Sequence, residues 1–106
     1  MQGRPAALIT GGSEGIGREF ANELARSGFD LVIASRSQEK LDNATEIIKH
    51  SNREVNIKSI PIDFAKASPS EIRKFFDDAT DTYPNLRILV NNVGIIKRTN
   101  FFDTDP

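Results

Sequence analysis

The sequence predicts an α/β fold built on a doubly wound parallel sheet, of which the chain supplies the N-terminal βαβαβαβ half. Four short apolar runs alternate with three longer segments whose apolar residues recur at helical spacing. Strands separated by helices pair in parallel through right-handed crossovers, with helices on both faces of the sheet. A glycine-rich turn also follows the first apolar run directly. Since four parallel strands make about half of such a sheet, the 106 residues are one domain or part of one.

The first apolar run, Ala6–Thr10, is short enough to predict a buried strand. A helix is expected after the glycines, ending at Gly28, because glycine readily takes the left-handed C-terminal cap. The apolar face of this helix is expected from Ile16, Phe20 and Leu24, which recur at a spacing of four, with Ala21 and Ala25 beside them.

The second strand is expected at Asp30–Ser35, where the run is again almost wholly apolar. Ser37 can cap a second helix that continues through Ile48. The inner face of that helix is expected from Leu41, Ala44 and Ile48. A third strand is expected within Val55–Ile62.

Ser68-Pro69-Ser70-Glu71 predicts the start of a third helix, because serine caps, proline suits the first turn and glutamate reaches back. Its apolar face is expected from Ile72, Phe75, Phe76 and Ala79. Pro84 and Asn85 end this helix, and Arg87–Asn91 predicts the fourth strand. The pattern fades after Gly94.

Composition excludes several classes of function. The chain is 38% hydrophobic and 27% charged, which is typical of a globular protein. A net charge of -1 gives no general attraction to nucleic acid, so no nucleic-acid partner is expected. There is no cysteine and one histidine, His50, so no metal site is expected. The carboxylates Asp77, Asp78 and Asp81 are expected to form a solvated helix face.

The glycine-rich turn reads "TGGSEGIG" (Thr10–Gly17) and leads from a strand into a helix. Ligands of open parallel sheets sit beyond the carboxyl ends of the strands, where this turn must lie. Glycine allows both a sharp turn and close approach of a phosphate to backbone N–H groups. The helix N-terminus then favours an anion. The spacing is T-G-x-x-x-G-x-G, which is neither G-x-G-x-x-G nor a P-loop, so a purely structural turn is the alternative.

Three motifs together resemble the short-chain dehydrogenase/reductase family, over nearly the whole chain from Ala6 to Gly94. "TGGSEGIG" is similar to its cofactor motif, and Asn91-Asn92-Val93-Gly94 ("NNVG") is similar to its N-N-A-G, with valine for alanine. Asp63-Phe64 stands where the family has an aspartate near the adenine. The segments "IASRSQEKL" and "ILVNNVG" look most like the branch of 17β-hydroxysteroid dehydrogenases and very-long-chain 3-oxoacyl-CoA reductases.

The resemblance implies that residues 1–106 are a partial NADP-binding Rossmann domain without the catalytic half. Its expected cofactor-binding residues are Gly11, Ser13, Gly15, Ile16, Gly17, Arg36, Ser37, Asp63, Phe64, Asn91, Val93 and Gly94. Three of these keep a second interpretation. Ser13 could instead stabilise the turn, Asp63 could cap a loop, and Asn91 could join neighbouring strands, besides holding the ribose.

The end of the second strand bears on the choice between NAD and NADP. An acidic residue there would bond the ribose hydroxyls of NAD and repel a 2′-phosphate. This chain has Arg36, whose planar cation suits a phosphate, and Ser37, which adds a hydroxyl. We therefore expect NADP(H); the alternative is that Arg36 is an ordinary surface charge. Glu14 stands where many NADP-using relatives have a basic residue, and it should weaken binding slightly unless it points to solvent.

No catalytic residue is expected within this chain. The family passes a proton through a tyrosine, with a lysine four residues later and a serine that orients the carbonyl. The one tyrosine, Tyr83, is followed by Pro84 and has Arg87 where the lysine should stand, so its role is expected to be structural. The family's catalytic residues would then lie beyond Pro106.

The resemblance implies an NADP(H)-dependent oxidoreductase that transfers a hydride to or from a keto or hydroxy group of a steroid or fatty-acyl substrate, with this chain supplying only the cofactor-binding part. The alternative is a truncated, non-catalytic remnant that binds a dinucleotide or a partner protein. A lipid or steroid substrate and a homodimer are expected only in a full-length form. The chain as written is expected in the cytoplasm, and a full-length form could be attached to the endoplasmic reticulum.

Overall fold

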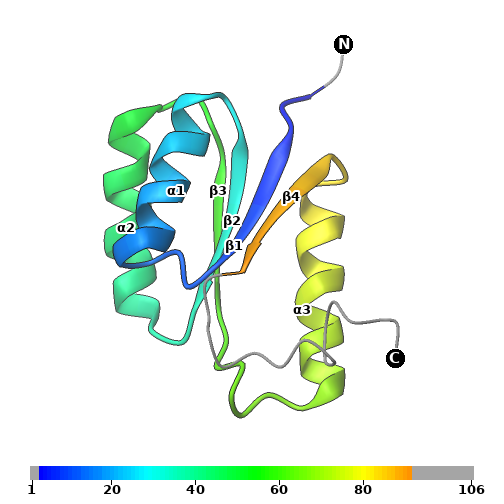
Figure 1. The fold of residues 1–106 in the computed structure, drawn as a ribbon. Coiled ribbons are helices and arrows are strands. Elements are labelled where there is room, and N and C mark those ends of the chain that lie inside the picture. Colours follow the sequence, from blue (N-terminus) through cyan, green and yellow to red (C-terminus); the bar gives the residue numbers. More distant parts are fainter. Residues whose placement is uncertain (1–2, 92–106) are drawn as a thin grey trace.

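A computed structural model describes residues 3–91, in which strands and helices alternate along the chain. Figure 1 shows a central sheet with helices on both sides. The elements are β1 (Ala6–Thr10), α1 (Gly15–Arg26), β2 (Asp30–Ser35), α2 (Gln38–Ser51), β3 (Ile57–Pro61), α3 (Pro69–Thr82) and β4 (Leu86–Asn91). The predicted βαβαβαβ order and α/β fold class are confirmed.

The sheet has the strand order β3-β2-β1-β4, and all its neighbouring strands are parallel. In the register of the sheet, Thr10 lies beside Ala34 of β2 and Asn91 of β4. Ser35 at the end of β2 lies beside Pro61 at the end of β3. The carboxyl ends of all four strands therefore lie along one edge, and the connection after each strand begins there.

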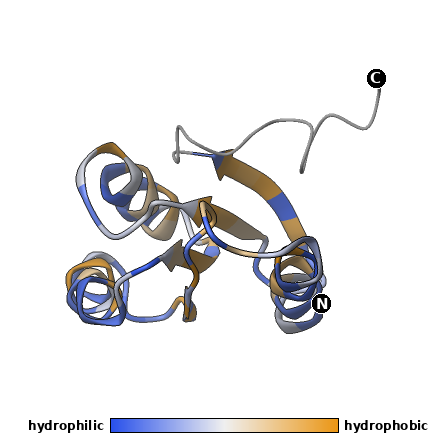
Figure 2. Cartoon of the chain, turned by 90° about the horizontal axis from the view of Figure 1, so that it is seen from below, coloured by the Kyte–Doolittle hydropathy of each residue, from blue (hydrophilic) through white to orange (hydrophobic). Residues whose placement is uncertain are grey.

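A separate hydrophobic core lies on each face of the sheet, between the strands and the helices that cover that face. On one face α1 and α2 pack against β1 and β2, and the buried residues are Ala7, Ile9, Ala21, Ala25, Leu31, Ile33, Leu41, Ala44, Ile48 and Val55. On the other face α3 packs through Phe75 and Ala79 against Leu8, Val32 and Ala34. Figure 2 shows the layers end-on, with the strands mostly in the hydrophobic colour between the helices. Parallel strands buried on both faces explain why β1 and β2 are almost wholly apolar.

The helix ends follow from local sequence. Gly28, at φ +93°, follows the end of α1, and its N–H donates to the carbonyl of Ala25 while that of Phe29 donates to the carbonyl of Leu24. These two bonds form a Schellman cap. Ser68 and Glu71 form the predicted capping box of α3. Such a cap contributes about 1 kcal/mol to stability.

The predicted apolar face of α1 is wrong in part. Ile16 and Phe20 are 66% and 49% exposed, whereas Gly17, Ala21 and Ala25 are the buried residues of this helix. Residues four apart form one row along a helix, and the row of small residues faces the sheet. Small side chains let α1 approach the strands closely. Of the neighbouring row of larger side chains, Ile16 and Phe20 stay at the surface, while Leu24 packs partly against the core.

Three element boundaries also differ from the prediction. α2 continues to Ser51, β3 is shorter than the predicted run, and β4 begins at Leu86. Val55 is fully buried although it precedes β3, because it packs in the core under α2. The inner faces predicted for α2 and α3 are confirmed, apart from Phe76, which is only partly buried.

Candidate functional site

The glycine-rich turn joins the carboxyl end of β1 to the start of α1. Gly11 and Gly15 have φ angles of +71° and +58°, in the left-handed region. A side chain there costs roughly 1–2 kcal/mol, so the backbone path of this turn favours glycine at both positions. The Gly11 N–H donates to the carbonyl oxygen of Ala34 at 2.8 Å, which ties the turn to the end of β2.

Gly12 allows the turn to pack onto the sheet. An added Cβ would lie 3.1 Å from Cγ2 of Ile33 and 3.3 Å from Cγ2 of Ile9, closer than ordinary contacts. Both isoleucines are fully buried, so they have little room to move. By contrast, a Cβ on Gly15 would meet nothing within 4 Å among the described residues. The backbone at Gly15 is therefore open toward the surface.

Helix α1 begins without the side-chain cap that α2 and α3 have. Its N-cap is Glu14, whose backbone is extended and whose side chain caps no N–H group. The first turn also contains no acidic residue. Free N–H groups and the helix dipole therefore favour an anion at this end of α1. Ile16, in that first turn, has its side chain at the surface.

Three serines connect the turn to the second strand and helix. The Ser13 hydroxyl is 6% exposed and donates to the Oγ of Ser35 at 3.1 Å. The backbone N–H of Ser37 donates to the same Oγ at 3.4 Å. Ser37 is also the N-cap of α2, as predicted, because its Oγ accepts from the N–H of Lys40. In this structure Ser13 thus stabilises the turn, and its contact with a cofactor stays a prediction.

The charged residues around the site are exposed. Arg36 precedes the Ser37 cap, and its guanidinium makes no hydrogen bond or ion pair within residues 3–91. The Lys40 ammonium lies 3.3 Å from the Glu14 carboxylate. The Glu14 side chain is exposed and pairs with a cation from α2, and the expected weakening of cofactor binding by this carboxylate stays a prediction.

The ends of β1 and β4 are joined by side chains. Thr10, which is 1% exposed, donates from its hydroxyl to Oδ1 of Asn91 at 3.0 Å, and the Val90 carbonyl oxygen lies at 3.4 Å. The structure thus bears out the interpretation that Asn91 joins neighbouring strands. Its contact with a ribose stays a prediction, and Val93 and Gly94 lie outside the described residues.

Asp63 and Phe64 follow β3. One Asp63 carboxylate oxygen accepts from the N–H of Ala65 at 3.0 Å, so Asp63 caps this loop. Phe64 contacts Phe75 edge to face at a centroid distance of 5.2 Å, which places it against the core under α3. A cavity of about 380 Å³ includes Asp63 in its lining, but its lining residues come only from positions 60–78 and exclude the glycine turn. Adenine binding by Asp63 and Phe64 stays a prediction.

Sequence reasoning missed three residues of this edge. Thr10 and Ser35 tie the turn to its neighbours, and Lys40 adds a cation opposite Glu14. The position of Thr10 and Ser35 as the last residues of their strands was the available signal. For Lys40 the sequence offered none, because the contact partner Glu14 is 26 residues away.

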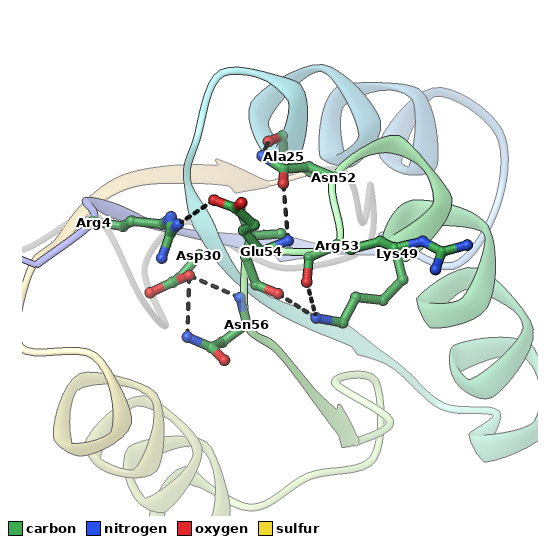
Figure 3. Close-up of polar contacts among 9 residues, drawn as sticks. Arg4, Ala25, Asp30, Lys49, Asn52, Arg53, Glu54 and Asn56 are labelled. Atoms are coloured by element: carbon green, nitrogen blue, oxygen red, sulfur yellow. Dashed lines mark hydrogen bonds and ion pairs between the residues drawn. The ribbon is translucent and has the colours of Figure 1, made fainter.

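The opposite edge of the sheet carries structural contacts. Figure 3 shows Arg4 paired with Glu54, and Asp30 accepting from the backbone and side chain of Asn56. Tyr83 also lies toward this edge, where burial, and secondarily the charge of Asp30, raise the pKa of its phenol. A raised pKa opposes the ionisation that a proton-transferring tyrosine needs, which agrees with the structural role predicted for Tyr83.

In the part of the chain that the structure describes, no group of three or more His, Asp or Glu side chains could hold a metal ion. No helix between residues 3 and 91 is long and apolar enough to cross a membrane.

The sequence matches the family model described as short chain dehydrogenase over residues 5–106. It is 36% identical over 89 residues to a very-long-chain 3-oxoacyl-CoA reductase of Coccidioides immitis, covering 84% of this chain and 25% of that protein. It is 40% identical over 93 residues to another of Phaeosphaeria nodorum, covering 84% and 26%. The chain thus spans about a quarter of the length of these curated relatives.

Solved structures give the same result. A short chain dehydrogenase from Salmonella enterica matches with a TM-score of 0.78 at 30% identity, covering 86% of this chain and 37% of that one. An NADPH dependent reductase involved in bacilysin biosynthesis matches with a TM-score of 0.77 at 27% identity, covering 85% and 35%. The chain therefore belongs to the short-chain dehydrogenase family, whose members bind a nicotinamide dinucleotide.

Proposed function

We propose that this chain is the cofactor-binding part of an NADP(H)-dependent oxidoreductase. In a longer protein it would support hydride transfer to or from a keto or hydroxy group of a steroid or fatty-acyl substrate. The observation that carries the proposal is the turn of Gly11 and Gly15, which have positive φ angles and lie in front of the uncapped N-terminus of α1. This arrangement suits a pyrophosphate, whose charge would meet backbone N–H groups and the helix dipole.

The donors available here fit a dinucleotide. The turn has an open backbone at Gly15, where a phosphate could approach, and Gly17, two residues later, is buried. The exposed side chain of Ile16 would lie beside the bound cofactor, and Asp63 and Asn91 would approach its adenine and ribose from the ends of β3 and β4. Val93 and Gly94, which lie outside the described residues, are proposed as further cofactor-binding residues. The cofactor itself would supply or accept the hydride.

Preference for NADP rests on Arg36 and Ser37. Both follow β2 directly, at the position where an acidic residue would select the ribose hydroxyls of NAD. The Arg36 guanidinium is exposed and forms no ion pair within residues 3–91, so it can receive a 2′-phosphate without giving up a partner. The Ser37 hydroxyl would add a second donor.

Proton transfer to the substrate needs residues outside this chain. Its single tyrosine, Tyr83, is followed by proline and lies away from the glycine turn. A serine and a Tyr-x-x-x-Lys pair would come from the remainder of a longer protein. A lipid or steroid substrate, a homodimer and attachment to the endoplasmic reticulum are likewise proposals for that longer form.

The test is cofactor affinity, measured by calorimetry with NADPH and NADH on the purified chain. We expect NADPH to bind more tightly, and Arg36→Asp to weaken NADPH binding at least tenfold because a carboxylate would then face the 2′-phosphate. Arg73→Asp is the control, since Arg73 is equally exposed but lies on α3. Unchanged NADPH affinity in Arg36→Asp would overturn the NADP proposal.

A non-catalytic dinucleotide- or partner-binding protein is the second candidate. The observation that favours it is that the glycine turn and the uncapped N-terminus of α1, which would hold a pyrophosphate, both lie within residues 3–91. Binding of NADPH without any hydride exchange, in the protein isolated from its natural source at its natural length, would support this candidate.

A further inference from the structure

An ion pair joins the start of α1 to the start of α2, beside the glycine-rich turn. The Lys40 ammonium, from the first turn of α2, lies 3.3 Å from the carboxylate of Glu14, the N-cap of α1. The two residues are 26 positions apart, and the β1-α1-β2 crossover brings them together. Their side chains are 54% and 63% exposed, so both are accessible to a ligand.

The pair contributes little to the stability of the fold. Exposed ion pairs are worth about 0–1 kcal/mol, because solvent screens them and two long side chains lose freedom. Glu14 is also not needed as a cap, since its side chain bonds no N–H group of α1. The position of the pair, between the phosphate-binding turn and the start of α2, is therefore better explained by ligand binding than by stability.

Glu14 places a negative charge where phosphates would arrive. Its carboxylate would repel a 2′-phosphate, and Lys40 is the cation that the structure holds against it. A phosphate dianion is a stronger partner for an ammonium than a carboxylate is. Lys40 is also on the same turn as Ser37, whose Oγ accepts from the Lys40 N–H, and Ser37 directly follows Arg36.

We propose that Lys40 is a specificity-determining residue for the 2′-phosphate of NADP. When NADP binds, the Lys40 ammonium exchanges its partner, the Glu14 carboxylate, for that phosphate. The proposal rests on the proposed function, because it assigns a second cation to the same site. Arg36 supplies the first, planar cation before the α2 cap, and Lys40 supplies a mobile one from the first turn of the helix.

The experiment measures binding of 2′,5′-ADP and of 5′-ADP to the 106-residue chain by calorimetry. We expect Lys40→Gln to weaken 2′,5′-ADP binding about fivefold and to change 5′-ADP binding by less than twofold. Lys40→Arg should retain most of the affinity. Lys74→Gln is the matched control, because Lys74 forms a similar exposed ion pair with Asp78 at 3.4 Å on α3.

Glu14→Gln separates direct contact from charge neutralisation. If Lys40 contacts the phosphate, Glu14→Gln alone should tighten 2′,5′-ADP binding about twofold, since the competing carboxylate is gone. Lys40→Gln should still weaken binding in that background. If instead the effect of Lys40→Gln disappears without Glu14, Lys40 acts only by neutralising Glu14, and the proposal is overturned.

The outcomes also separate this proposal from the proposed function. Unchanged 2′,5′-ADP affinity in Lys40→Gln, together with a large loss in Arg36→Asp, would overturn the role of Lys40 alone. Equal affinity of the wild-type chain for the two nucleotides, or binding of neither, would overturn both. Circular dichroism checks that each variant is folded, which we expect because both substituted side chains are exposed.

Discussion

The hydroxyl of Thr10 donates a hydrogen bond of 3.0 Å to Oδ1 of Asn91, 81 residues later in the sequence. This contact fixes the carboxyl end of β1 to that of β4 at the edge where the glycine turn begins. Thr10 is 1% exposed, so little water competes for its hydroxyl. The bond therefore links the first residue of the glycine-rich turn to Asn91, the last residue of β4 and the first of the NNVG motif.

Thr10→Val should destabilise the chain. Valine has the shape of threonine but cannot donate, so the bond from the buried Thr10 side chain to the exposed Asn91 is lost. We expect a loss of about 1 kcal/mol in the free energy of unfolding, measured by urea denaturation. Thr10→Ser keeps the hydroxyl and serves as the comparison. A stability equal to wild type in Thr10→Val would mean that the bond contributes nothing to the fold.

Gly15→Ala should cost stability through the backbone alone. The φ of +58° is unfavourable for alanine, while the added Cβ meets no atom of the described chain within 4 Å. We expect a loss of about 1 kcal/mol, and a smaller loss for Gly15→Asn, because asparagine tolerates the left-handed region. Thermal unfolding of the two variants measures this.

The NADPH affinity of the Gly15→Ala variant tests whether a phosphate binds at this position. If a pyrophosphate approaches the backbone at this position, Gly15→Ala should weaken NADPH binding well beyond its effect on stability, because the methyl group occupies the open space. Gly28→Ala is the control, since Gly28 also has a positive φ with open space around it but caps the far end of α1. Equal NADPH affinity in the two variants would argue against a phosphate at Gly15.

Tyr83 should titrate above the ordinary tyrosine value of about 10. Burial is the larger cause and the charge of Asp30 the smaller, and both favour the neutral phenol. Because the chain has one tyrosine and no tryptophan, absorbance near 295 nm reports this group alone. Asp30→Asn should lower the pH at the midpoint of the Tyr83 titration. Unfolding the chain should lower that midpoint further.

The sign of the effect on stability follows from the same pKa. A folded-state pKa above that of the unfolded chain means that the unfolded chain loses the proton first as the pH rises. The stability contributed by the neutral phenol is therefore fully present below about pH 10 and is lost as the pH rises through the folded pKa. Urea denaturation at increasing pH should show a shallower alkaline decline for Tyr83→Phe than for wild type.

Much of the fold was predictable because each element carries its own signal. The capping box of Ser68 and Glu71 starts α3, and the left-handed cap at Gly28 follows α1, as the sequence indicated. Which face of α1 packs against the sheet was not predictable, because a hydrophobicity pattern favours Ile16 and Phe20 over alanines as the buried residues. Which row faces the sheet depends on how closely the helix approaches the strands, and a sequence pattern does not contain that distance.

The glycine turn of the candidate site was predictable from the sequence, but the side-chain contacts around it were not. Positive φ angles at Gly11 and Gly15 follow from the turn itself, so local sequence was enough. The contacts of Ser13 with Ser35 and of Glu14 with Lys40 are not local, because they form only after the crossover brings the two strand ends together. These contacts determine which groups Ser13 and Glu14 bond to in this structure.

The amino edge of the sheet offers a practical position for attachment. Its ion pair between Arg4 and Glu54 and its bonds between Asp30 and Asn56 serve to hold the strands in register. The five residues of β1 separate this edge from the glycine turn by about 16 Å. A fluorophore or surface linker attached near residue 3 would therefore leave the edge that carries the glycine turn accessible, and immobilised chains could be screened against nucleotides in one orientation.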